Sequence, residues 1–187
     1  DLGSRGLAQR ETVMVEHHLP KAHCMMPDPS NRFVLAPVLQ ADMVAVRRFD
    51  AASGMLTHHN PPSLHAKTGH GPRHTKFHPN SRFVYVLNEL GATLDAYAFD
   101  IGHGSFGHIQ HESLLPPGFT GAPSAAEIDI TPDGRFLYAS ERITSTLCAF
   151  AIDRETGRLT RIGHFPTGTK PRAFAIDPRG KYLLAGG

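Results

Sequence analysis

The chain has 187 residues, 40% of them hydrophobic, and a formal net charge of +2 at pH 7. Its 19 basic residues are scattered along the sequence, which argues against a nucleic-acid partner. The two cysteines are too few for a disulfide framework, and we find no leader-like segment and no apolar run of about eighteen residues, so we expect a cytoplasmic protein without a membrane span.

A short phrase recurs along the chain: a Pro-led turn, a basic residue and a short apolar strand. It occupies residues 29–36, 79–86, 132–139 and 178–185. The aromatic residues that anchor these phrases are spaced 50, 53 and 46 residues apart, at Phe33, Phe83, Phe136 and Tyr182. A period near fifty residues is typical of β-propeller blades, which bury their faces by stacking around an axis.

Each repeat has room for four strands. In the second repeat we expect them at residues 74–77, 83–87, 93–99 and 107–111, from β-branched and aromatic content and from apolar alternation. The third repeat gives 127–130, 136–140, 146–152 and 159–164, and the first gives 23–26, 33–37, 42–49 and 56–59. Residues 114–126 are rich in Pro, Gly and Ser and predict an irregular loop between blades.

These patterns predict an all-β fold, a β-propeller with four-stranded blades, in one partial propeller domain over residues 1–187. Three repeats and an opening half-repeat make about three and a half blades, fewer than the four to eight that close a ring. The chain begins at Asp1 and ends just after an expected strand. We therefore expect a fragment whose ring is completed by missing blades or by another chain.

Counting from the anchoring aromatic residues groups polar side chains that are distant in sequence. Ten residues before the anchors stand His23, Arg73, Ala126 and Arg172, and six residues after them stand Leu39, Glu89 and Arg142. The innermost strand of a blade starts on the face where the second strand ends, so both offsets point to one rim of the central channel. The basic residues of the phrases are expected on the opposite face: Arg32, Arg82, Arg135 and Lys181.

The expected rim cluster suits a small anionic substrate. Arginine forks bind carboxylate or phosphate oxygens, and a carboxylate beside a histidine can move protons near neutral pH. We expect Glu141 to be the structural partner of Arg142, and His74 to face a neighbouring blade or the channel wall. The adjacent histidine pairs at 17–18 and 58–59 would point to opposite faces of a strand, so no metal is expected.

Several segments resemble the lactonase family of seven-bladed propellers. They are 69–74 (Gly-His-Gly-Pro-Arg-His), 77–79 (Phe-His-Pro), 85–90 (Tyr-Val-Leu-Asn-Glu-Leu), 125–128, 131–135 and 171–174. Bacterial members of this family are 6-phosphogluconolactonases, and fungal relatives are carboxymuconate lactonizing enzymes. The resemblance runs from about Lys21 to the chain end and implies about half of a seven-bladed ring.

The resemblance also implies roles for residues of the rim. His23, Arg73, Glu89 and Arg142 match the polar positions proposed as the active site of the lactonizing relatives, and are therefore expected to be catalytic. His74 favours the phosphogluconolactonase branch and is expected to bind substrate, as is Arg172 as an anion contact. The loop at 38–42 departs from the family by lacking a Leu-Gly pair. No metal or organic cofactor is implied.

We therefore expect an enzyme that hydrolyses a sugar-acid lactone, 6-phosphogluconolactone, in the pentose phosphate pathway. Arginines would hold the phosphate and the oxyanion, with Glu89 or His23 as the base. Two alternatives stay open: a carboxymuconate cycloisomerase, and a non-catalytic binding scaffold, although the chain lacks the tryptophan of the common scaffold type. Besides the lactone, the open half-ring invites self-association or completion by the missing blades.

Overall fold

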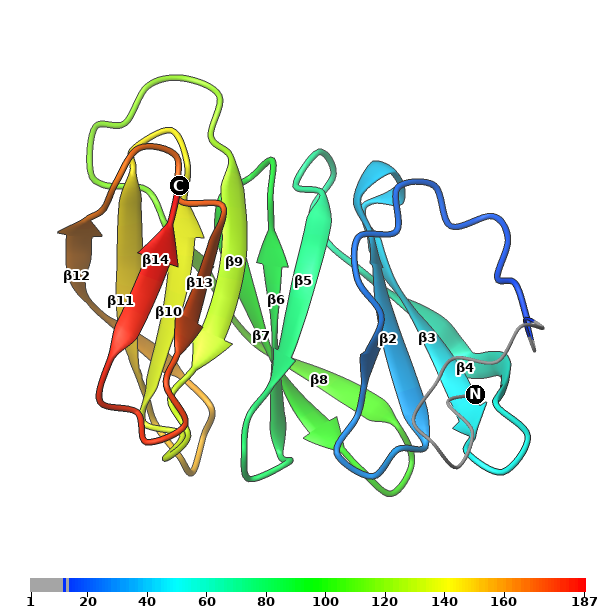
Figure 1. Ribbon diagram of the computed structural model, residues 1–187. Helices are drawn as coiled ribbons and strands as arrows, with labels where there is room; N and C mark the ends of the chain where they lie inside the picture. Colours follow the sequence, from blue (N-terminus) through cyan, green and yellow to red (C-terminus); the bar gives the residue numbers. More distant parts are fainter. Residues whose placement is uncertain (1–11, 13) are drawn as a thin grey trace.

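The computed structural model describes residue 12 and residues 14–187. In this part of the chain the strands form four antiparallel sheets that stand side by side like blades (Figure 1). None of the described residues belongs to a helix with the length and apolar character needed to cross a membrane.

Three sheets have four strands, each in sequence order, and the fourth has two. The first blade contains β1 (Met26–Pro27), β2 (Phe33–Val38), β3 (Met43–Asp50) and β4 (Met55–His65), with a 3-10 turn at Leu39–Ala41. The second contains β5 (Pro72–Phe77), β6 (Phe83–Asn88), β7 (Thr93–Asp100) and β8 (Ser105–Ser113). The third contains β9 (Ala125–Ile130), β10 (Phe136–Glu141), β11 (Thr146–Ile152) and β12 (Leu159–Pro166), and the last contains β13 (Ala173–Ile176) and β14 (Leu183–Gly186). The expected all-β propeller with four-stranded blades is confirmed.

The expected strand lengths were wrong at the inner and outer edges of the blades. The inner strand of the first blade is only β1, preceded by an isolated bridge between Ala22 and Val38. The outer strands are longer than expected: β8 pairs with β7 along its whole length, from Asp100–Ser105 to Thr93–Ser113. The residues of β8 are exposed or half-buried, so backbone pairing rather than apolar alternation defines this strand. β4 even contains two prolines, which an edge strand tolerates.

The recurring phrase is a hydrogen-bonded turn between the first and second strands. In each repeat the residue before the proline donates its N–H to the carbonyl oxygen of the anchoring aromatic residue, at 2.8 to 2.9 Å, in the pairs Asp28–Phe33, His78–Phe83, Thr131–Phe136 and Asp177–Tyr182. The Asp28 and Asp177 carboxylates also accept the N–H of Phe33 and Tyr182, both at 2.7 Å. The side chain thus satisfies backbone donors that the tight turn leaves unpaired.

The anchoring aromatic rings of the first two blades, Phe33 and Phe83, pack against the next blade. The β11–β12 turn of the third blade brings Gly157 so close to the ring of Phe83 that an added Cβ would lie 2.4 Å from it. Gly104, in the β7–β8 turn of the second blade, meets Phe33 of the first blade in the same way, also at 2.4 Å. Each of these two rings therefore fills a slot that only a glycine leaves open.

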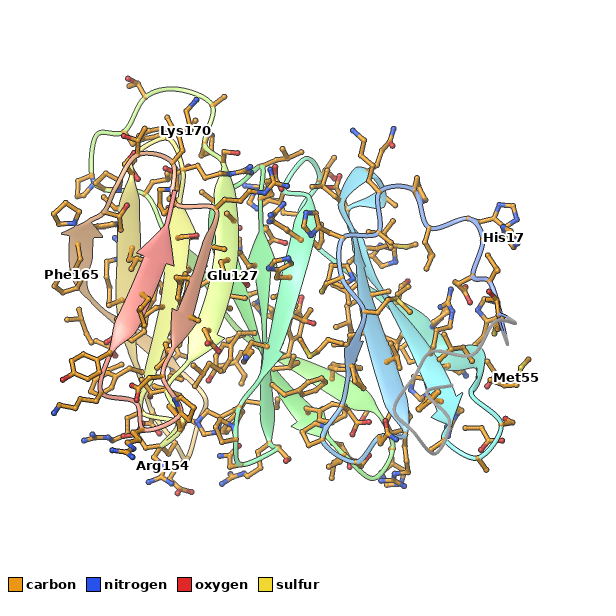
Figure 2. All side chains as sticks on the ribbon, in the orientation of Figure 1. His17, Met55, Glu127, Arg154, Phe165 and Lys170 are labelled. Carbon is orange, nitrogen blue, oxygen red and sulfur yellow. The ribbon has the colours of Figure 1, made fainter. Side chains whose placement is uncertain are left out.

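The basic residues of the phrases strengthen this junction. The guanidinium of Arg82 lies 5.3 Å from the ring centroid of Phe83, and its Nη2 donates to the carbonyl oxygen of Glu155 at 3.1 Å. Arg32 donates in the same manner to the carbonyl oxygen of Ile101. The hairpin that carries Arg154 lies at one face of the molecule, and the loop that carries Lys170 lies at the other (Figure 2).

The largest apolar cluster joins the second blade to the third. Tyr85 and Leu87 of β6 meet Leu137 of β10 and Phe150 of β11, and all four are fully buried. This core fixes the spacing and the angle between the two blades, and so it determines where their inner strands begin.

Replacing Gly157 with alanine is expected to lower the free energy of unfolding, because the new methyl group would clash with Phe83. Overpacking of this kind costs about 1–3 kcal/mol. Gly118→Ala is the matched control, because its φ of +77° is close to the +73° of Gly157 and the added Cβ meets nothing within 4 Å. Chemical denaturation of the two variants measures the difference. An equal loss of unfolding free energy in both variants would contradict the close packing of Phe83 against Gly157.

Candidate active site

The strand register brings the residues at both sequence offsets to one rim of the channel. Pro72, which opens β5, pairs with Asn88, which closes β6, so Glu89 follows at the same edge. The Glu89 N–H donates to the carbonyl oxygen of Gly71 at 2.8 Å, and the N–H of Ala125, the first residue of β9, donates to the Glu89 carbonyl oxygen at 3.0 Å. The backbone thereby connects the Glu89 loop to the starts of two inner strands.

A β-bulge at the start of β5 directs two neighbouring side chains to the same target. The register of β5 against β6 shifts between Pro72 and His74, which leaves Arg73 as the extra residue. Regular alternation would send Arg73 and His74 to opposite faces of the sheet. Here both contact His23. The pairing of β9 with β10 shifts at the corresponding place, between Ala139 and Glu141.

The centre of the cluster is a carboxylate held by two arginines. Glu89 Oε2 lies 2.8 Å from Arg73 Nη1, and its Oε1 lies 2.7 Å from Arg142 Nη2. Arg73 Nε also donates to the carbonyl oxygen of Ala126 at 2.6 Å, and Arg142 Nε donates to that of Ser124 at 3.1 Å. Each arginine is thus fixed by a charge and by the backbone that opens the third blade.

Two histidines extend the cluster toward the first and third blades. Arg73 Nη1 donates to His23 Nε2, and His23 Nδ1 lies 3.1 Å from His74 Nε2. His74 Nδ1 lies 2.8 Å from Oε1 of Glu127 on β9, which Figure 2 shows between β9 and β5. Three blades therefore contribute to one hydrogen-bonded network.

The surroundings set the protonation states. Burial favours the neutral form of Glu89, but the hydrogen bond from Arg142 and the two guanidinium charges outweigh it and hold the pKa of this carboxyl below its usual value. Burial, followed by the charge of Arg73, lowers the pKa of His23. Burial also opposes ionisation of Glu127, but the hydrogen bond from His74 lowers its pKa overall. At neutral pH the site thus holds ionised carboxylates beside a neutral His23.

Arg172 lies at the edge of this group. Its N–H donates to the carbonyl oxygen of Gly186 at 3.1 Å, which places it where β13 begins. Burial is the main cause that lowers the pKa of His23 and of Arg73, and the charge of Arg172 adds to it in both cases. The side chain is exposed and, within residue 12 and residues 14–187, makes no hydrogen bond or ion pair. It is the arginine of the group with the most freedom to meet an anion.

The structure corrects one expectation and adds one residue. Glu141 is fully buried and does not pair with Arg142: its carboxylate accepts the N–H of Ser124 at 2.5 Å and that of Thr144 at 2.6 Å, because it closes the two flanking loops. The added residue is Glu127. It stands nine residues before its aromatic anchor, as His74 does before Phe83, so the same counting at offset nine would have found it.

The loop at residues 38–42, which lacks the Leu-Gly pair of the family, has a structural role. Residues 39–41 form the 3-10 turn, and Asp42 follows with φ +50°. Its two carboxylate oxygens accept the N–H groups of Gly69 and Gly71, each at 2.8 Å. The first blade thereby fixes the loop that leads into Arg73.

Two cavities bear on the place of the site. A cavity of about 140 Å³ borders the histidines and is lined by Cys24, Met26, His74, Thr75, Lys76, Glu127 and Ile128. A larger one, about 510 Å³, lies between residues 14–19 and the β3–β4 sheet edge, and it contains none of the clustered residues. The described residues contain no group of three or more histidine, cysteine or acidic side chains arranged to hold a metal ion.

Comparison with known proteins shows the family of the chain. Residues 6–187 match the family of seven-bladed β-propeller lactonases, so the chain belongs to that family. A 6-phosphogluconolactonase of Pectobacterium carotovorum is 42% identical over 187 residues, which is 100% of this chain and 55% of that protein. One from Serratia proteamaculans is 36% identical over 169 residues, covering 90% of this chain and 51% of that protein.

Solved structures give the same result. The periplasmic gluconolactonase of Pseudomonas aeruginosa superposes with a TM-score of 0.85 at 32% identity, covering 92% of this chain and 51% of that one. The propeller domain of a Myceliophthora Swd1 protein, at 11% identity and a TM-score of 0.66, shares the fold alone. The chain spans about half the length of the curated relatives it matches.

Glu89→Gln is expected to remove a pH-dependent part of the stability. The pKa of Glu89 is held below its ordinary value of 4.5, so the ionised form stabilises the fold fully above that value and less as the pH falls through the lowered pKa. At neutral pH the variant should lose about 2–3 kcal/mol, and the difference from wild type should disappear in acid. Denaturation across pH measures it.

Glu155→Gln is the control for this experiment, because the Glu155 side chain is 86% exposed and its pair with Arg82 spans 3.4 Å. Exposed ion pairs contribute little to the free energy of unfolding. A difference between wild type and Glu89→Gln that persists unchanged in acid would contradict the role given to the carboxylate.

Proposed function

We propose that the whole protein hydrolyses a sugar-acid lactone, 6-phosphogluconolactone to 6-phosphogluconate, at the rim cluster. The observation that carries this proposal is the Glu89 carboxylate held between Arg73 and Arg142 beside a neutral His23, in a chain of the lactonase family. The names of the similar proteins support the substrate: two relatives are 6-phosphogluconolactonases and the similar structure is a gluconolactonase.

In the proposed mechanism the arginines stabilise the charge that develops on the lactone. Attack by water converts the carbonyl oxygen into an oxyanion, and N–H donors already held in place stabilise that state more than the ground state. Arg73 and Arg142 are such donors, because Glu89 and the backbone carbonyls of Ala126 and Ser124 fix both guanidinium planes.

His23 is the better candidate for the base. Both oxygens of Glu89 are engaged by arginines, which lower the pKa of the carboxyl and weaken it as a proton acceptor. The Nε2 lone pair of neutral His23 becomes available when the lactone oxygen takes the Arg73 N–H. The water proton passes to Nε2 as the water oxygen bonds to the carbonyl carbon. The ring C–O bond then breaks, this proton passes to the leaving alkoxide, and the new carboxylic acid loses its own proton to solvent.

Arg172 is proposed to bind the phosphate. It adds a positive charge beside His23 and Arg73, as the pKa values of both residues reflect, and its exposed guanidinium suits phosphate oxygens. Recognition of the phosphate would then lie at the junction of the third and fourth blades, beside the reacting groups.

Turnover of 6-phosphogluconolactone by the whole protein tests this proposal. Arg73→Ala is expected to lower kcat/KM by about 100-fold or more, because it removes an oxyanion donor. Arg172→Ala should raise KM for the phosphorylated lactone and leave the rate on gluconolactone nearly unchanged.

Lys76→Ala, which removes only the surface end of the pair with Asp129, is the matched control and should retain the rate. Full activity of Arg73→Ala would contradict the proposal that the rim cluster is the active site. Turnover of a muconate with no lactone hydrolysis would replace the proposed function with the cycloisomerase, and a stable protein partner without either activity would favour the scaffold.

We also propose that further blade strands cover the β13–β14 sheet in the whole protein. This sheet has two strands where the other blades have four, and Tyr182 and Leu184 are 61% and 66% exposed. The chain of 187 residues alone is therefore expected to self-associate through these apolar side chains and open strand edges. Light scattering that shows a stable monomer of this chain would contradict the proposal.

A further inference from the structure

A chain of hydrogen bonds crosses the site from a guanidinium to a carboxylate. It runs from Arg73 to His23, on to His74, and ends at Glu127. The residues come from the first, second and third blades, so it is a feature of the blade arrangement and not of one strand.

The two ends fix the direction of every bond. A guanidinium can only donate and an ionised carboxylate can only accept, whereas a neutral imidazole has one donor and one acceptor nitrogen. His23 Nε2 must therefore accept from Arg73, which puts its proton on Nδ1, facing His74 Nε2. His74 Nε2 must then accept, which puts its own proton on Nδ1, facing Glu127. Both tautomers follow from this one argument.

We propose that Glu127 is a positioning residue: once the lactone oxygen has taken the Arg73 N–H, Glu127 acts through His74 to keep the His23 proton on Nδ1 and the reactive lone pair on Nε2. This inference rests on the proposed function, because it says which nitrogen of His23 receives the water proton. His74, with both ring nitrogens engaged, transmits this orientation from the third blade to the first.

The carboxylate is well fixed for this task. Glu127 Oε1, which accepts from His74, also accepts the N–H of Ile128 at 3.1 Å, and the Glu127 N–H donates to Ser140 Oγ at 3.0 Å. A rigid acceptor leaves His74 one orientation in which its Nδ1 proton has a partner.

The charges around His23 explain why a distant carboxylate matters. Arg73 and His74 face the ring from β5, Glu89 faces it from the loop after β6, and Arg172 faces it from the segment before β13. The arginine charges disfavour the imidazolium that forms when Nε2 takes a proton. Glu127 offsets them through the Nδ1–H bonds of the two histidines, while each Nδ1 proton stays on its own nitrogen.

The strands that carry this chain also carry a natural control. Two residues further along β5 and β9, Lys76 Nζ lies 2.7 Å from Asp129 Oδ1, and this oxygen accepts the N–H of Ile130 as Glu127 does that of Ile128. Asp129→Ala therefore removes an equivalent carboxylate between the same two blades, but one that does not reach His23.

The test is the tautomeric state of the histidines in the whole protein, read from the ring ¹⁵N shifts and couplings and assigned with His→Gln variants. Wild type is expected to show both His23 and His74 protonated on Nδ1. Glu127→Ala should change the tautomer of both rings in an Arg73→Ala background, where no guanidinium fixes them, whereas Arg73→Ala alone should keep them. Glu127→Gln, whose amide oxygen can still accept, should keep them, and Asp129→Ala should leave them unchanged.

Kinetics give the second measurement. Glu127→Ala should lower kcat/KM about tenfold or more, with most of the loss in kcat, and should shift the acidic limb of the pH profile to lower pH because the imidazolium loses support. Glu127→Gln should recover part of the rate, and Asp129→Ala should match wild type.

The outcomes separate this inference from the function on which it rests. A wild-type protein with either histidine protonated on Nε2 overturns the inference even if Glu127→Ala fails to fold. Glu127→Ala with wild-type rate and pH profile also overturns it. A wild type that shows the expected tautomers but hydrolyses no lactone removes the proposed function and leaves the geometry in place.

Discussion

The arrangement of the site depends on the Glu89 carboxylate, which forms ion pairs with two arginines from different blades. Arg73 belongs to the second blade and Arg142 to the third, and each oxygen of Glu89 satisfies one of them. Partly buried charges are costly unless each is paired and hydrogen-bonded. Here the backbone carbonyls that open the third blade accept the Nε–H of each arginine. These carbonyls carry no full charge, so removing Glu89 would take away the carboxylate that pairs with both guanidinium groups.

The blade junctions make this pairing possible. Phe83 fills the slot at Gly157, and Arg82 closes it from outside by donating to the same hairpin. The junction lies at the face opposite the rim, while the apolar cluster of Tyr85 and Phe150 lies between. Since interiors are close-packed and deform little, fixing one face and the core also fixes the starts of β5 and β9. The recurring phrase therefore positions the rim residues without touching them.

Much of this could be predicted from the sequence because a propeller repeat preserves offsets. Arg73, Glu89, Arg142 and His23 were grouped by counting from aromatic anchors, and the structure brings them together, although their catalytic roles stay predictions. Glu127 was missed because only the residues ten before and six after each anchor were compared, and Glu127 stands nine before Phe136. The bulge at Arg73 was also missed, since an extra residue in a strand leaves no signal in apolar alternation. The outer strands were underestimated because they are exposed and defined by backbone pairing.

In the part of the chain that the structure describes, the paired charges of the site lie in the second and third blades, and its unpaired charge lies at the fourth. Within the described residues, Arg73 and Arg142 are neutralised in part by Glu89, and Glu127 adds a second negative charge behind His74. Arg172, just before β13, carries a positive charge that no side chain of the described residues pairs with. In the proposed mechanism, chemistry at the first three blades and phosphate binding at the fourth can then vary separately. A preference for phosphorylated substrates would depend on Arg172, while the proposed proton-transfer groups stay the same.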